Sequence, residues 1–277
     1  MKILPELFVS SLLPLVISLS ATSAASAFVL QLDFGPTTPT GANLTNSPYH
    51  SVLGGSESTW NVLGTTDSSS LFYGDGTAAT GVAIDLGSSA NNDLINFANQ
   101  PGSNNALGVR INDGVFSGNS VGRDGIFHGS SGEKNVIGLK ITGLDLGIYD
   151  IFMVGINTNI TPNAAGSAGL PQNMGALATT NVGTLDIASL SSALVSNYET
   201  VSDPDAANWI EGTNFARFSV TLTADNPVLT LFTVGNDDRG FLNSVQVTVI
   251  PEPSTYALIS GFLAIGFLTI RRFRKKK

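Results

Sequence analysis

Three residues near the end of the sequence, Pro251, Glu252 and Pro253, have the types and spacing that a processing enzyme can recognise. Proline fixes φ and disfavours helix in the residue before it, so the two prolines hold Glu252 in an extended and accessible conformation. Such a segment can enter an enzyme cleft without any unfolding, and Glu252 adds a charge for a basic pocket to contact. We therefore expect these three residues to form a recognition motif.

The residues after this motif are predicted to hold it at a membrane. An uncharged run, residues 255–270, follows at once and should form a transmembrane helix. Its sixteen residues span roughly 24 Å as a helix, less than the ~30 Å hydrocarbon core, so local thinning or snorkelling must cover the difference. The basic tail should stop the helix and stay in the cytoplasm; it contains Arg271, Arg272, Arg274, Lys275, Lys276 and Lys277.

Together, residues 250–277 resemble a PEP-CTERM sorting signal, the C-terminal tag of some bacterial envelope proteins. That tag has a Val-Pro-Glu-Pro-Ser-Thr-like motif, a short apolar helix and an Arg-rich end; this chain has Ile250 in place of Val and mixes Lys with Arg. The resemblance implies that a membrane-embedded exosortase is a partner and cleaves at or near the Pro-Glu-Pro motif. It covers about a tenth of the chain and implies nothing about the rest. An ordinary tail anchor is the alternative.

The first 27 residues are predicted to be a secretory signal peptide. Lys2 supplies a positive start, residues 7–19 are apolar, and Ala25 and Ala27 form the small-residue cleavage pattern. An uncleaved anchor is the alternative, although the apolar run is short for a membrane span. We therefore expect an exported protein whose mature chain begins at Phe28. It should be anchored in the inner membrane before processing and lie at the cell surface or in the extracellular matrix afterwards.

The segment between the two ends is strongly acidic. The chain has 13 Lys and Arg against 21 Asp and Glu, but seven of the basic and two of the acidic residues lie in the terminal segments. Residues 28–250 therefore carry 6 basic and 19 acidic side chains, a net charge of −13. This charge argues against nucleic acid as a partner. Cysteine is absent, which excludes a disulfide framework, a thiol nucleophile and Cys-ligated zinc.

Short β-rich runs separated by turn residues dominate residues 28–250. Residues 137, 139 and 141 share one face of a predicted strand, with Lys140 on the other. Residues 147–157 are almost wholly apolar, as in a central strand covered on both faces. In residues 215–223 the even positions are apolar and predicted to point inward. We expect one all-β domain over residues 28–250, an antiparallel, jelly-roll-like β-sandwich with very little helix.

Three segments of this domain resemble malectin-like and galactose-binding-like jelly rolls at the level of general pattern. They are Leu-Asp-Phe-Gly at residues 32–35, the run with a Gly-x-Tyr strand entry at residues 143–152, and Phe-Leu-Asn-Ser-Val-Gln-Val at residues 241–247. This resemblance supports the fold more than any particular ligand.

No catalytic constellation emerges from the sequence. A Gly-x-Ser-x-Gly elbow, a His-Glu-x-x-His pair and a Walker loop are all absent. The two histidines, His50 and His128, each stand near serines, but a histidine in such a position is more often structural. We therefore expect that the protein is not an enzyme. Some pair of carboxylates will lie at glycosidase distance by chance, so this feature nominates no residue.

Ligand sites can be proposed only as candidates. Exposed aromatic rings stack on sugar faces, and the candidates for such stacking are Trp60, Tyr73, Tyr198 and Trp209, with Tyr49 behind them. Of these, we select Trp209 and Tyr198. Trp209 precedes the alternating strand in a polar loop; packing at the end of the core is its alternative role. Oxygen ligands for Ca²⁺ are available at residues 236–238 and at Asp203, Asp205 and Glu211, although solvated turn carboxylates are the simpler interpretation. We expect no metal site and no cofactor, with Ca²⁺ as the alternative.

Two functions therefore remain after the sequence is considered. The first is a non-catalytic envelope or extracellular-matrix protein that an exosortase sorts and that binds an extracellular polysaccharide. The second is a secreted hydrolase acting on polysaccharide. Glycan binding without turnover favours the first, and release of reducing ends favours the second.

Overall fold

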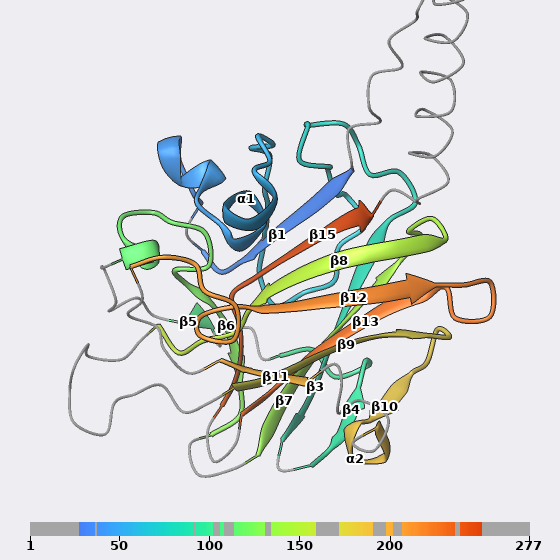
Figure 1. Cartoon of the computed structure of the whole chain (residues 1–277). Helices are drawn as coiled ribbons and strands as arrows, with labels where there is room; N and C mark the ends of the chain where they lie inside the picture. The colour runs from blue at the N-terminus through green and yellow to red at the C-terminus, as the bar shows by residue number, and fades with distance from the viewer. Residues whose placement is uncertain are drawn as a thin grey trace, which may run out of the picture.

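The central segment folds into two stacked β-sheets, as the computed structural model in Figure 1 shows. The structure describes residues 28–36, 38–90, 92–101, 106–107, 114–130, 134–158, 172–190, 198–201, 207–235 and 239–250. Within these ranges, strands far outnumber helical residues, so the predicted all-β sandwich is confirmed.

The first sheet, sheet A, has five strands among the described residues. Their spatial order is β12 (Ala216–Leu222), β8 (Gly147–Val154), β15 (Ser244–Ile250), β1 (Val29–Phe34) and β2 (Asn61–Leu63). Neighbours pair antiparallel, except that β1 and β2 are parallel. Strand β8 lies between β12 and β15 and is largely buried on both faces, as its apolar sequence predicted.

The second sheet, sheet B, has seven strands, all antiparallel to their neighbours in the described part of the chain. Their order is β10 (Thr184–Asp186), β4 (Leu94–Asn96), β3 (Ala83–Ala90), β7 (Asn135–Thr142), β13 (Val228–Gly235), β9 (Gln172–Thr179) and β11 (Tyr198–Val201). A smaller sheet contains β14 (Gly240–Leu242), β6 (Gly125–His128) and β5 (Ala106–Leu107). Strands β14 and β15 follow each other directly in sequence, and Asn243 between them marks the point where the chain passes from the smaller sheet to sheet A.

The main core lies between sheets A and B and follows the alternation of the sequence. In β12 the inward residues are those predicted: Ala216, Phe218, Val220 and Leu222. In β7, Ile137, Leu139 and Ile141 face the same core. Burying an apolar side chain of this size stabilises the fold by about 1.5–3 kcal/mol, so this alternation suffices to set which face of each strand packs inward.

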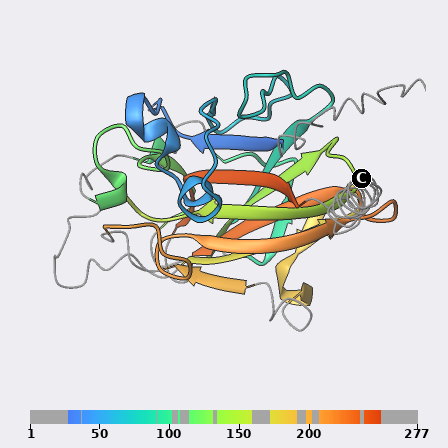
Figure 2. The same ribbon diagram turned by 45° about the horizontal axis from the view of Figure 1, so that its top comes forward.

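The outer face of each sheet carries a further apolar cluster. The sheet A cover includes α1 (Pro48–Leu53) and the 3-10 helix η2 (Gly114–Phe116), with η1 (Gly41–Thr45) beside them. Its buried residues are Val29, Tyr49, Val115, Phe116, Phe152, Val154, Trp209 and Phe215. The sheet B cover includes α2 (Ile187–Leu190), and its buried residues are Ile95, Phe97, Val136, Leu185, Ile187, Phe232 and Val234. Figure 2 shows α1 lying over the strands of sheet A.

Two predicted features cannot be compared with this structure. The signal peptide and the sorting signal, residues 1–27 and 251–277, lie outside the described residues. None of the helices within the described ranges has the length and apolar character that crossing a membrane requires.

Candidate binding pocket

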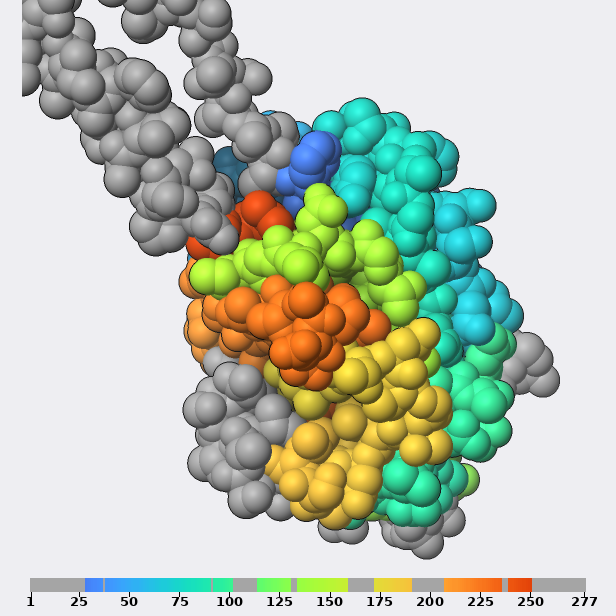
Figure 3. All heavy atoms as spheres, turned by 90° about the vertical axis from the view of Figure 1, so that its right-hand side faces the viewer, coloured from blue at the N-terminus to red at the C-terminus, as the bar shows by residue number. Residues whose placement is uncertain are grey.

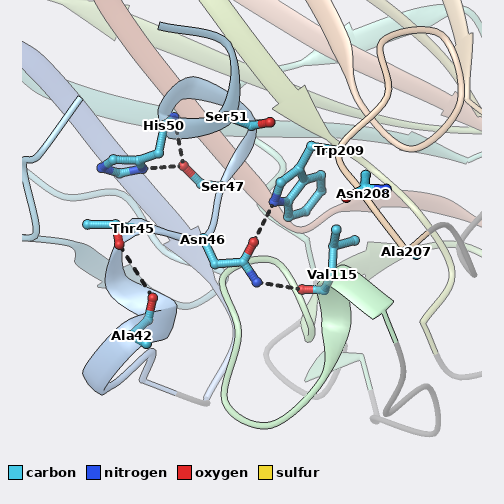
Figure 4. A pocket seen from close by; sticks show the side chains of 10 residues that line it. All are labelled: Ala42, Thr45, Asn46, Ser47, His50, Ser51, Val115, Ala207, Asn208 and Trp209. Atoms are coloured by element: carbon cyan, nitrogen blue, oxygen red, sulfur yellow. Dashed lines mark hydrogen bonds between the residues drawn. The ribbon is translucent and has the colours of Figure 1, made fainter. Parts of the chain in front are cut away.

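A pocket of about 300 Å³ opens between the η1–α1 segment and the loop before β12 (Figure 4). Its polar lining residues are Thr45, Asn46, Ser47, His50, Ser51 and Asn208; its apolar ones are Ala42, Val115, Ala207 and Trp209. None of these lining residues is Asp, Glu, Lys or Arg. The pocket therefore offers hydrogen-bonding groups and an aromatic ring without offering a permanent charge.

The short helix α1 forms one wall, and its sequence explains where it begins and ends. Ser47 is the N-cap, Pro48 occupies the first helical position, and Gly54 ends the helix with a left-handed φ of 70°. Tyr49 fixes the helix to sheet A: its backbone N–H donates to the Gln246 side chain at 3.1 Å. Its ring also packs edge-on against Phe152, with 6.1 Å between centroids. The wall is thus anchored in sheet A.

Trp209 forms the opposite wall and is held by Asn46. The indole Nε1 donates to Asn46 Oδ1 at 3.0 Å, and Asn46 Nδ2 donates to the Val115 carbonyl at 3.3 Å. Trp209 is only 8% exposed and packs edge-on against Phe116, with 5.3 Å between ring centroids. Asn46 therefore connects three segments that are distant in sequence, and Trp209 can offer a ligand its edge rather than a whole ring face.

Ser47 and His50 are directly hydrogen-bonded beside the pocket. Their Oγ and Nδ1 atoms are 2.6 Å apart, and His50 Nε2 lies 2.7 Å from the Glu57 carbonyl oxygen. A carbonyl only accepts, so Nε2 carries the hydrogen, and in a neutral ring Nδ1 then accepts from the Ser47 hydroxyl. Burial lowers the His50 pKa, although the Glu57 carbonyl and carboxylate oppose this change. The imidazole is thus held neutral, and the Ser47 side chain is fully buried.

A buried carboxylate lies elsewhere on the outer face of sheet A. Asp33 is inaccessible to solvent, and its Oδ1 accepts from the Gly122 N–H at 2.8 Å. Its Oδ2 has no hydrogen-bond partner among the described residues. Burial raises the Asp33 pKa well above its ordinary value, the Gly122 N–H opposes this, and the charge of Asp124 adds to it. This carboxylate is therefore a site where the fold opposes ionisation.

The predicted site residues fall into three groups. Trp209 and His50 line the pocket, and Tyr49 lies buried behind it. Trp60 donates from Nε1 to the Leu44 carbonyl at 2.9 Å and is not among the lining residues. Tyr73 packs 5.0 Å from Phe28. The side chain of Tyr198, the residues proposed for sorting (Pro251, Glu252, Pro253 and the basic tail) and the signal cleavage residues Ala25 and Ala27 lie outside what the structure describes.

The predicted calcium ligands are mostly outside the described residues as well, since Asp203, Asp205 and residues 236–238 are not among them. Across the parts of the chain that are described, no group of three or more His, Asp or Glu side chains could hold a metal ion. His128 lies on β6, where burial lowers its pKa. It is not among the pocket residues.

Sequence reasoning missed α1 and the pocket that it lines. Ser47, Pro48 and Gly54 carry the start and stop signals of a short helix, and these signals could have identified it. Asn46 and Asn208 had no such signal, because their role depends on contacts between distant segments. No protein-family model matches the chain, and no curated protein matches it.

Proposed function

We propose that this protein is an exported bacterial envelope or extracellular-matrix protein whose β-sandwich binds a neutral glycan without cleaving it. The observation that carries this proposal is the uncharged, hydrogen-bonding pocket between α1 and Trp209. Sugars without acidic groups present hydroxyls, which polar side chains can bond, and apolar CH groups, which can contact the exposed edge of Trp209. The volume is at the lower end of the roughly 300–1,000 Å³ that ligand pockets have, which suits one or two sugar rings.

The charge of the domain supports a neutral ligand rather than an acidic one. Residues 28–250 have a net charge of −13, and none of the described residues that line the pocket is a lysine or arginine. A uronic acid or sulfated sugar would therefore meet long-range repulsion and find no cation to pair with. A neutral hexose, or an amino sugar with an acetylated nitrogen, carries no charge, so it is not repelled and needs no cation.

The strand order supports a jelly roll as the finer description of the sandwich. In sheet A the run β1-β15-β8-β12 and in sheet B the run β7-β13-β9-β11 place eight strands as two facing four-stranded sheets. Along the chain these strands alternate between the sheets, except from β9 to β11, as two interlocked Greek keys require. Strands β3, β4 and β10 then extend sheet B beyond β7, and β2 extends sheet A beyond β1.

The ends of the sequence carry the sorting part of the proposal. The signal peptide at residues 1–27 exports the chain, and residues 255–270 hold it in the inner membrane. An exosortase then recognises Pro251, Glu252 and Pro253 and releases the domain to the cell surface or matrix. Replacing these three residues with alanine should leave membrane insertion intact but block removal of the tail. An epitope after residue 277 that is lost equally from parent and variant would contradict this reading.

Glycan binding is best tested by filling the pocket from an exposed position. Ser51 lines the pocket, and its neighbour Val52 lies on the same helix but is not among the lining residues. Ser51→Trp should abolish binding of neutral oligosaccharides on a glycan array and in calorimetry, whereas Val52→Trp should retain it. Equal binding by both variants would show that the pocket is not the site. Uronic acid oligosaccharides serve as the negative ligand set.

A hydrolase is the second candidate, and the Ser47–His50 hydrogen bond is the observation that favours it. A serine that donates to a neutral histidine is the ground state from which nucleophilic catalysis begins. The full burial of Ser47 and its position as a helix cap argue for a structural role instead. If the protein releases reducing ends from the host polysaccharide and Ser47→Ala abolishes this release, the hydrolase is correct. Binding without turnover supports the first proposal.

A further inference from the structure

An exposed apolar patch lies at the end of sheet A from which both terminal segments continue. It consists of Phe28, Leu146 and Ile250, which are 55%, 58% and 36% exposed, with the Tyr73 ring 5.0 Å from Phe28. Val29 pairs with Thr248, and Ile250 pairs with Ile148, so the strand register brings these residues to one end. Figure 3 faces this end, where the start of β1 in blue, the turn before β8 in lime and the end of β15 in red are neighbours.

Exposed apolar side chains that gather at one place usually mark an interaction surface. Other exposed apolar residues of the described chain, such as Leu94 and Ile210, lie elsewhere on the fold. The patch also combines aromatic rings with aliphatic side chains, and such residues are enriched where proteins meet the membrane–water interface.

The tail determines which partner can reach this patch. Only residues 251–255 separate Ile250 from the apolar run that begins at Tyr256. Five extended residues reach roughly 17 Å at most. The headgroup layer takes up roughly 5–8 Å of that distance on each side of the bilayer. While the tail is attached, the patch is therefore held against or very near the lipid headgroups.

We propose that this patch docks on the outer surface of the bilayer while the apolar tail is inserted. This inference rests on the proposed membrane attachment. Exposed carboxylates at the same end, those of Asp75, Asp145 and Asp225, exclude attraction to anionic lipids as the cause. Docking is therefore apolar and favours zwitterionic lipid. The phosphatidylcholine interface takes up the patch, and the acidic side chains stay in water around it.

Docking at this end has a consequence for the binding pocket. Phe152 lies five residues along β8 from Gly147, which places it roughly 17 Å further from the patch. Its ring packs against Phe215, and Phe215 packs against the pocket residue Trp209. The pocket is thus at the other end of sheet A from the bilayer. In the docked state it opens toward extracellular polymer instead of toward lipid.

The test uses the full chain in phosphatidylcholine proteoliposomes. Because the chain contains no cysteine, Leu146→Cys and Ile210→Cys each create a unique thiol for a polarity-sensitive fluorophore. Both positions are exposed, so neither label disturbs the core. We expect a several-fold rise in emission at position 146 on reconstitution and quenching by spin-labelled lipid, with neither effect at position 210. Equal, water-like emission at both positions would overturn docking.

Further arms separate this inference from the proposals beneath it. Replacing part of the phosphatidylcholine with phosphatidylserine should not strengthen the signal at position 146, and a stronger signal would overturn apolar docking. If position 146 becomes protected only when exosortase is also present, the occupant is that protein and membrane docking is wrong. Alkaline carbonate extraction measures tail insertion independently. An inserted chain with a water-exposed position 146 contradicts docking alone, whereas an extractable chain contradicts the sorting proposal as well.

Discussion

The two sheets of the sandwich are covered in different ways, and the buried charges beneath the covers show the difference. Under the sheet B cover, Lys140 Nζ is 2.7 Å from Asp85, donates to Asn181 and the Val182 carbonyl, and lies 4.4 Å from the centre of the Phe97 ring. On sheet A, Asp33 has one backbone donor and an Oδ2 atom without a hydrogen-bond partner in the described ranges. Each of these two carboxylates keeps one oxygen without a hydrogen-bond partner in the described ranges, but Asp85 is paired with a lysine, whereas no ion pair is found for Asp33 there. Sheet A also carries the pocket.

This contrast suggests a division of roles between the two covers. The sheet B cover adds stability, because it buries an apolar cluster and pairs the charge of Lys140. The sheet A cover positions α1 and Trp209 and so prepares a binding surface at some cost in polar burial. Functional sites commonly keep such locally unfavourable features, which the rest of the fold offsets.

The largest expected effect comes from removing one buried ring from each cover. Phe152 lies beneath Tyr49 and Phe215 on sheet A, and Phe232 lies over Gly175 on sheet B; both are buried. Phe152→Ala and Phe232→Ala should each cost about 3–5 kcal/mol in urea unfolding. Only Phe152→Ala should also abolish glycan binding at temperatures where the variant is folded, since it alone supports the pocket wall. Loss of binding in Phe232→Ala as well would contradict the division of roles.

A smaller effect is expected from the buried lysine. Lys140→Met removes the charge-assisted hydrogen bonds to Asn181 and Val182 and the ion pair with Asp85, at a cost of about 2–3 kcal/mol. Lys134 is the matched control, because its ion pair with Asp93 is solvent-accessible. Lys134→Met should cost less than about 1 kcal/mol in the same denaturation assay. Equal costs would show that burial adds nothing to the Lys140 interactions.

Replacing Asp33 should raise the free energy of unfolding at neutral pH, whereas the substitutions above lower it. A raised folded-state pKa means that the stability this group contributes is present below its ordinary value of 3.8 and is lost as pH rises through the folded value. Asp33→Asn removes this loss and keeps an oxygen that can accept from Gly122. The stability of the variant relative to the parent should therefore increase as pH rises from about 4, by about 1.4 kcal/mol for each unit of pKa shift. A difference that does not vary with pH would show that Asp33 ionises without cost.

The sequence predicts those features of the two covers that depend on local strand periodicity, and it misses those that depend on contacts between distant segments. Alternation in residues 137–141 and 215–223 predicted the correct inward faces, because strand periodicity is local. The same pattern placed Lys140 on the outer face but contained nothing about the loop around Val182 that buries it, 42 residues away. Asn46 and Trp209, which close the pocket, are separated by 163 residues. Such contacts become visible only when the sheets have brought their segments together.

The smallest expected effect concerns His50. Burial lowers its pKa below the ordinary 6.5, so its contribution to stability is present above that value and is lost as pH falls through the folded-state value. Protonation would also make Nδ1 a donor, and the Ser47 hydroxyl would have to turn its own hydrogen away. His50→Gln should remove part of the decrease in stability between about pH 6.5 and 5, by less than about 1 kcal/mol.

His128 provides the control for this last measurement. Burial lowers its pKa as well, but it lies on β6 and does not line the pocket. Acid should therefore destabilise the domain through both histidines, while only His50 links acid to ligand affinity. We expect glycan affinity to decrease as the pH is lowered from about 7 to 5, a range around the ordinary histidine pKa, in both the parent and His128→Gln. Calorimetry measures this affinity. In His50→Gln the affinity should be independent of pH over the same range. If the affinity of the parent does not change with pH, the neutral Ser47–His50 pair plays no part in shaping the pocket.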